Sequence, residues 1–216
     1  MYSATNRELY DKYWDEGAAF SDEGKWDKAV VSFTNAIKYH PKLPDNYGTY
    51  VNRANAYSML GKLDLAIADY KKVIGSFTDK TAKELGEVYY NMGAAYHTNG
   101  KPELAIPQYE KAISIDSEIK SVHNKLAWLL ATSPDPKIRD GKKAVEHGLI
   151  ACKQTGNKNP GYLDTLSAAY AENGDFANAV LTKRKAIELL DDVNEKKDYT
   201  TRLELYESNK PYRAQK

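Results

Sequence analysis

The chain has 216 residues, with 31 lysines and arginines against 30 aspartates and glutamates, so its formal net charge is +1. A nearly neutral chain without a basic stripe has no long-range attraction for nucleic acid or an anionic membrane, and we expect neither as a partner. Cys152 is the only cysteine, which excludes an intrachain disulfide. Beside Ala151 it is predicted to be a small buried packing residue. No apolar run reaches membrane-spanning length and none opens the chain, so the predicted compartment is the cytoplasm.

In chain order, apolar periodicity predicts paired helices after a polar segment, residues 1–9. The first pair covers about 7–22 and 26–39, and the second about 46–60 and 63–75. The third begins near residue 80, where Thr78 or Asp79 is expected to cap it, and its second helix opens at Pro102. The fourth pair ends with a helix over about 140–155, and the fifth covers about 160–173 and 176–190. One further helix is predicted over about 192–208.

The paired helices repeat one pattern in a fixed register. The first helix of each pair has a small residue at Gly17, Ala54, Gly93, Ala127 and Ser167. Three residues later come Phe20, Tyr57, Tyr96, Leu130 and Tyr170, and the predicted turn glycines are Gly24, Gly61, Gly100, Gly141 and Gly174. The second helices carry Ala29, Ala66, Ala105, Ala144 and Ala179, then Ala36, Val73, Ala112, Ala151 and Ala186, with bulky Phe33, Tyr70 and Tyr109 between them in the first three copies. Alternating small and large residues let two antiparallel helices interlock at short separation.

This pattern resembles the tetratricopeptide repeat (TPR), a helix–turn–helix unit of about 34 residues. Copies four and five, with the segments 126–136 and 162–166, are similar to bacterial multi-TPR proteins. The resemblance implies an all-α, right-handed α-solenoid with repeats at about 10–43, 47–80, 86–119, 120–158 and 160–193. Residues 194–216 are then a C-terminal capping helix and tail, predicted to cover Leu181, Ile187 and Leu190 of the last repeat.

Nothing in the sequence assembles a catalytic or metal site. The histidines His40, His97, His123 and His147 lie on four different elements, and no pair has the i, i+4 spacing of a helical zinc site. There is no glycine-rich phosphate loop and no nucleophile elbow. We therefore expect no cofactor, no metal and no enzymatic activity.

In the TPR family, the first helices of the repeats line a concave groove. Counted from the family motif, the predicted peptide-binding residues are Trp14, Val51, Asn52, Asn55, Met59, Glu87, Tyr90, Asn91, His97, Asn124 and Trp128. Further groove positions include Ala131, Thr132, Asp164, Ala168 and Glu172. Aromatic residues are frequent interface anchors, and amides can hydrogen-bond a ligand backbone. The alternative is that Trp14 packs on the N-terminal segment and Trp128 covers the loop over 133–140.

Some TPR co-chaperones bind an acidic C-terminus through a carboxylate clamp of lysine, asparagine and arginine. The corresponding positions here hold Trp14, Ala18, Asn52, Glu87 and Asn91, of which only Asn52 matches the clamp. The sequence therefore favours a non-enzymatic adaptor that binds a peptide segment of a partner protein in its groove. The alternative is a structural module that self-associates through the groove or the terminal helix, and a weaker one is a regulatory subunit of an enzyme.

Overall fold

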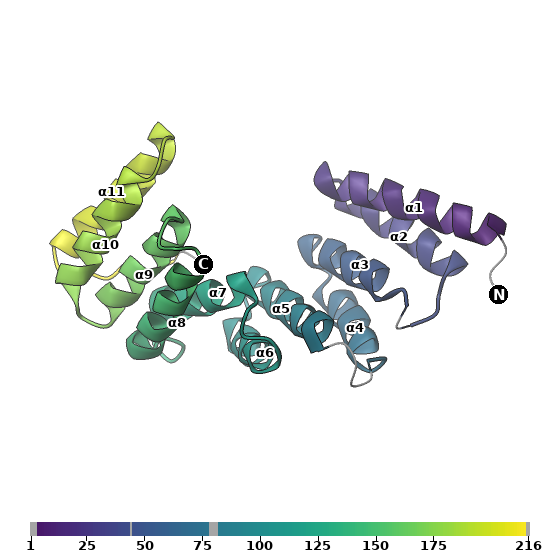
Figure 1. Cartoon of the computed structure of the whole chain (residues 1–216), viewed down its shortest axis with the longest axis horizontal. Coiled ribbons are helices and arrows are strands. Elements are labelled where there is room, and N and C mark those ends of the chain that lie inside the picture. Colours follow the sequence, from purple (N-terminus) through teal and green to yellow (C-terminus); the bar gives the residue numbers. More distant parts are fainter. Residues whose placement is uncertain (1–3, 44, 78–81, 215–216) are drawn as a thin grey trace. The chain divides into compact units, whose positions relative to one another are not determined.

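The computed structural model describes residues 4–43, 45–77 and 82–214, and within these ranges the chain forms eleven α-helices and no strand (Figure 1). The predicted caps Thr78 and Asp79 lie outside the described residues. The helices are α1 (Ala4–Asp22), α2 (Trp26–Tyr39), α3 (Tyr47–Met59), α4 (Leu63–Ile74), α5 (Ala82–Thr98), α6 (Pro102–Ile115), α7 (Lys120–Thr132), α8 (Gly141–Gln154), α9 (Pro160–Glu172), α10 (Phe176–Glu188) and α11 (Val193–Glu207). Five antiparallel hairpins followed by one helix confirm the predicted all-α architecture. Helix α1 begins within the segment 1–9 that we predicted to be a separate polar segment.

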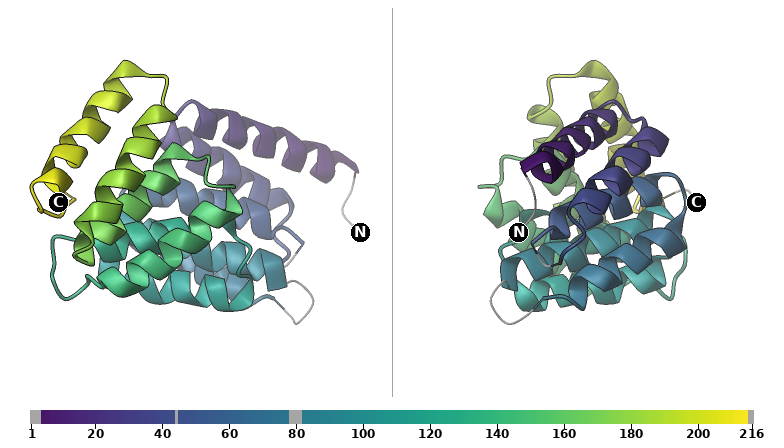
Figure 2. Two further views of the ribbon diagram at one scale, coloured as in Figure 1. Left: turned by 60° about the vertical axis from the view of Figure 1, so that its left-hand side comes forward. Right: turned by 90° about the vertical axis from the view of Figure 1, so that its right-hand side faces the viewer.

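The helices form two compact units, with α1–α6 in unit 1, which ends at Asp116, and α7–α11 in unit 2, which begins at Ser117. In unit 1, the first helices of successive hairpins contact each other, α1 with α3 and α3 with α5. The second helices α2 and α4 each contact the first helix of the next hairpin. Within unit 2, α7 likewise contacts α9, and α8 contacts α9 (Figure 2). Each unit thus has an inner layer of first helices, as the repeat pattern predicts.

The small and large positions interlock inside each hairpin. Gly17 and Gly93 are buried, and a Cβ on Gly93 would lie 2.8 Å from the ring of Tyr109. A Cβ on Gly17 would lie 2.6 Å from the ring of Phe33. The second-helix positions Ala29, Ala66, Ala105, Ala144 and Ala179 are fully buried, as are Ala36, Val73, Ala112, Ala151 and Ala186. The predicted register of the repeat is therefore the register of the core.

Hairpins one, two, three and five close through one backbone motif. Gly24, Gly61, Gly100 and Gly174 each follow a first helix with φ between +70° and +82°, a conformation that glycine adopts without steric cost. The N–H of the next residue then donates to a carbonyl one turn back: Lys25 to Phe20, Lys62 to Tyr57, Lys101 to Tyr96 and Asp175 to Tyr170, at 2.8–2.9 Å. These four glycines have the predicted role in the turn.

The prediction of a turn role for Gly141 is wrong. Gly141 is the first residue of α8, and the N–H of Asp140 donates to the carbonyl of Leu130 (3.0 Å) across the inserted segment 133–139. Asp140 therefore takes the place that Lys25 holds in the first hairpin. Gly24 precedes Lys25, whereas Gly141 follows Asp140, so the glycine is displaced by two positions. A Cβ on Gly141 would lie 2.7 Å from the backbone nitrogen of Asn173, so glycine permits close approach of α8 to the end of α9.

Cys152 is buried in unit 2, in a cluster with Leu163, Leu166 and Ala186. Burial raises the pKa of its thiol to about 11, so the thiolate is scarce near neutral pH. The predicted packing role of Cys152 is confirmed. Among the described residues, none of the helices has the length and hydropathy to cross a membrane.

Helix α11 covers the end of unit 2 mainly through its last turns. Tyr206 is fully buried, and Leu190, which precedes α11, is 6% exposed. Arg202 pairs with Asp164 of α9 (3.0 Å), and the buried Lys183 of α10 contacts the same carboxylate. The prediction that this helix covers Leu181 is wrong, since Leu181 is 66% exposed. Buried charge, as well as apolar area, therefore fastens the cap.

Two glycine substitutions test the interlocking. Gly93→Ala places a methyl group 2.8 Å from the ring of Tyr109 and should destabilise the protein by about 1–3 kcal/mol. Gly48→Ala, in α3, meets no atom within 4 Å and should be neutral or stabilising by up to about 1 kcal/mol. Urea unfolding followed by circular dichroism measures both. Equal unfolding midpoints for the two variants would contradict the interlocking.

Candidate functional site

The predicted groove residues of unit 1 lie on the inner helices α1, α3 and α5. Helix α1 carries Trp14, α3 carries Val51, Asn52, Asn55 and Met59, and α5 carries Glu87, Tyr90, Asn91 and His97. Met59 is 52% exposed, Glu87 is exposed, and the other members except Val51 are half-buried. These residues, without Val51, are called the unit 1 groove below.

Val51 does not present a groove surface. It is 8% exposed and belongs to a core cluster with Ala54, Tyr70 and Val88. Its side chain packs between repeats, and its predicted role as an apolar contact for a ligand is therefore corrected.

The two predicted aromatic anchors rest on the hairpin cores. Trp14 packs against the cluster of Ala29, Phe33 and Ala56, a contact that neither sequence prediction includes. The ring of Tyr90 lies 6.0 Å from that of the buried Tyr109. Each aromatic residue is half-buried, so its position is fixed from behind while part of its surface stays exposed. A fixed aromatic side chain loses little conformational entropy on binding.

The polar residues of the unit 1 groove are partly engaged. The side-chain oxygen of Asn55 accepts a hydrogen bond from the hydroxyl of Tyr70, and an amide has two further N–H donors. Glu87 follows Glu84 by three residues on α5, so the two carboxylates lie on one face of the helix. Burial first, and then the charges of Glu84 and Glu87, raise the pKa of Tyr47. A carboxylate ligand would meet this negative potential, which agrees with the failure of the clamp pattern.

Polar contacts that the sequence pattern missed connect the helices of unit 1, one within the second hairpin and one between the second and third hairpins. Arg53 of α3 donates from Nε and Nη2 to Asp69 of α4 at 2.8 and 2.7 Å. The amide of Asn99, after α5, donates to the Oγ of Ser58 in α3 (3.1 Å). These long-range pairs have no local sequence signal, and they fix the helices that carry the groove.

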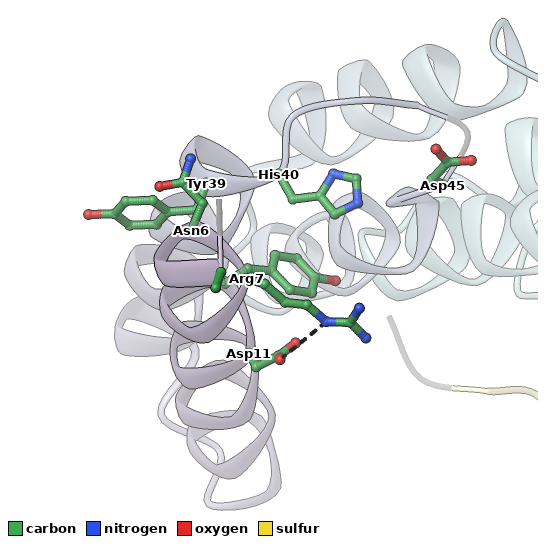
Figure 3. Close-up of a pocket in the computed structure, with 8 residues that line it drawn as sticks. Asn6, Arg7, Asp11, Tyr39, His40 and Asp45 are labelled. Atoms are coloured by element: carbon green, nitrogen blue, oxygen red, sulfur yellow. Dashed lines mark ion pairs between the residues drawn. The ribbon is translucent and has the colours of Figure 1, made fainter. Parts of the chain in front are cut away.

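A cavity of about 490 Å³ opens at the start of unit 1, between α1 and the link from α2 to α3 (Figure 3). Arg7 and Asp11 line it as an ion pair 4.0 Å apart, with exposed fractions of 84% and 60%. The ring of Tyr10 packs edge-on against His40, with centroids 5.4 Å apart. Exposed ion pairs contribute little because water screens them. This ion pair therefore places no desolvated charge in the cavity.

In unit 2, the predicted groove positions are covered by the chain itself. The ring of Trp128 lies 5.9 Å from that of Tyr212, so this tryptophan contacts the C-terminal tail, a contact that neither sequence prediction includes. Glu172 pairs with Arg213 (2.6 Å), and Asp164 pairs with Arg202 of α11. The side-chain oxygen of Asn124 is buried, without a hydrogen-bond partner among the described residues.

Two histidines from different helices meet in unit 2, although no sequence spacing predicts it. The Nδ1 atoms of His123 in α7 and His147 in α8 are 2.9 Å apart, so one ring donates to the other. Burial lowers the pKa of both rings, and the charge of His123 lowers that of His147 further. Within the described ranges, the structure holds no group of three potential metal-binding side chains. The pair is therefore a neutral hydrogen bond between helices.

Comparison with known proteins agrees with this geometry. Residues 45–118 match the family model described as tetratricopeptide repeat. No curated protein matches the chain significantly.

The crystal structure of MamA is similar, with a TM-score of 0.63 and 23% identity over 88% of this chain and 94% of that one. YrrB, described as a TPR protein with an unusual peptide-binding site, has a TM-score of 0.63 and 14% identity over 93% and 100%. A thermophilic TPR protein of Thermus thermophilus has a TM-score of 0.58 and 18% identity over 93% and 98%. The predicted resemblance to the TPR family is confirmed, and the chain has the fold of TPR proteins.

The histidine pair predicts that the folded protein loses stability as the pH falls. Because both folded-state pKa values lie below 6.5, the unfolded chain binds protons first as the pH falls. The contribution of the pair to stability is therefore complete above pH 6.5 and is lost at lower pH. His147→Gln cannot acquire this charge, and its free energy of unfolding should fall less than that of the parent between pH 7.5 and 5.5. Urea titrations of the parent and of His147→Gln at the two pH values measure this change. An equal loss of free energy of unfolding in both proteins would contradict the assignment of a neutral, buried histidine pair.

Proposed function

We propose that the protein is a non-enzymatic scaffold that binds a peptide segment of a partner protein along the unit 1 groove. The observation that carries this proposal is the pairing of aromatic residues held from behind, Trp14 and Tyr90, with half-buried asparagines on the same layer of helices. Such a surface provides fixed apolar contacts together with hydrogen-bond donors and acceptors for a ligand backbone.

The charges near the unit 1 groove restrict the class of partner that fits it. Glu87 is exposed on α5 near Glu84, and no clamp of basic residues faces them at the corresponding positions. A neutral or basic segment fits this surface better than an acidic C-terminus. The affinity should depend only modestly on salt, because the anchors are aromatic.

The experiment begins with recovery of a partner by pull-down and mass spectrometry, followed by calorimetry with the purified partner. Met59→Ala removes a half-exposed side chain from the inner helix α3 and should weaken binding about fivefold, equivalent to about 1 kcal/mol. Leu65→Ala is the matched control, because Leu65 is also half-exposed, at 49%, but lies on the second helix α4. Met59→Ala and Leu65→Ala should both melt close to the parent.

Equal loss of affinity in the two variants, or none in either, would contradict binding along the inner helices. Sedimentation over a range of concentrations tests self-association, the rival function. A dimer that Met59→Ala dissociates, without any heterologous partner, would replace the adaptor by a self-assembling module.

A further inference from the structure

The C-terminal tail of unit 2, residues 211–214, contacts its inner helices in a manner that differs from the cap before it. Helix α11 ends at Glu207, and Asn209 takes a φ of +56°, which turns the chain out of the helix. The following residues have no regular secondary structure and reach the end of α7.

The tail supplies hydrogen-bond donors to the carbonyl groups at the C-terminal end of α7. The last four carbonyl groups of an α-helix have no partner within the helix. In α7, the carbonyls of Leu129 and Leu130 accept from Ser133 and Asp140. Those of Ala131 and Thr132 accept from the tail: Arg213 Nη1 donates to Ala131 (3.5 Å), and the backbone N–H of Ala214 donates to Thr132 (2.9 Å).

Side chains add selectivity to these backbone contacts. The ring of Tyr212 lies 5.9 Å from the ring of Trp128 and 5.4 Å from the guanidinium of Arg202. Arg213 pairs with Glu172 at 2.6 Å, close to the C-terminal end of α7, where the helix dipole favours a cation. This surface therefore accepts a sequence of three residues: an aromatic residue, an arginine and a small residue whose backbone N–H can donate.

The contacts of the tail are weak enough for a ligand to displace it. Its residues are only half-buried, and the side chain of Arg213 is 34% exposed, so each contact is individually weak. Glu172 keeps a second partner, because Arg139 Nε donates to its Oε1 at 3.0 Å. The cap itself is held separately, by the buried Tyr206 and by the pairing of Arg202 with Asp164. After release of residues 211–214, Glu172 thus still pairs with Arg139, and α11 stays attached to the unit.

We infer that Trp128, Glu172 and the C-terminal carbonyls of α7 form a second peptide-binding site, which accepts an aromatic–arginine–small segment of a partner protein. Residues 211–214 occupy this site as an internal competitor that the partner displaces. The inference rests on the proposed scaffold function but uses a different unit and different residues. It can therefore fail while the unit 1 groove is upheld, and the reverse also holds.

The test uses the full-length chain and a capped synthetic peptide with the sequence of residues 209–214. A tethered tail competes at a high effective concentration. The double variant Tyr212→Ala/Arg213→Ala should therefore bind the peptide at least about tenfold more tightly than the parent does. Arg184→Ala, which removes an exposed ion pair with Glu207 on the same unit, is the control and should bind like the parent.

Peptide variants test the chemistry of recognition. Replacing the arginine of the peptide by glutamate, or its tyrosine by alanine, should abolish binding to the double variant. Binding that ignores both changes, or equal affinity of the parent and the double variant, would overturn the inference. So would the absence of any binding by a double variant that melts like the parent.

Hydrogen exchange gives a readout that needs no substitution in the chain. In the parent, the amide of Ala214 should be protected by its bond to Thr132, and excess peptide should accelerate its exchange while α11 stays protected. An unchanged rate at saturating peptide would refute displacement. A parent dimer that the peptide converts to monomers would instead show that the tail is exchanged between copies, which overturns the internal competitor.

Discussion

The close approach of paired helices at small residues is the constraint on which the rest of the structure depends. Gly17 leaves the space that the ring of Phe33 fills, and Gly93 leaves the space for Tyr109. Interiors packed at this density do not yield gradually, so one added methyl group forces a side chain or a helix to move. Every later feature, including the direction of the inner helices and the surface they carry, follows from these contacts.

This constraint also explains why the sequence alone predicts most of the fold. Each contact between a small and a large residue recurs at a fixed spacing, and a repeat protein is stabilised mainly by interactions of each unit with its neighbours. The helix ends are equally local, since a glycine with positive φ closes four of the turns. Copy four breaks this rule, because its insertion, 133–139, transfers the turn bond to Asp140 and moves Gly141 into the helix.

The site was less predictable, because its decisive contacts join residues far apart in the chain. Counting along the motif gives the helix face on which a residue lies, but it does not give the partner. Val51 was assigned to the groove and lies in the core. His123 meets His147, and Glu172 meets Arg213, through packing that no short-range pattern records. Trp128 is predicted from the motif to line the groove, yet its aromatic neighbour, Tyr212, comes from the tail.

Capping and the peptide site that we propose in unit 2 use the same chemistry. A terminal repeat must cover its last apolar face and the polar positions of its inner helices. Here Asp164, a groove position by the family motif, is neutralised by Lys183 and Arg202, a buried arrangement that is costly to break. Glu172, further along α9, has one partner in the body of the unit and one in the tail. The inner face of α9 thus changes along its length from a buried, fully paired carboxylate to one that is shared with the tail, and the shared end is where we propose that a partner enters.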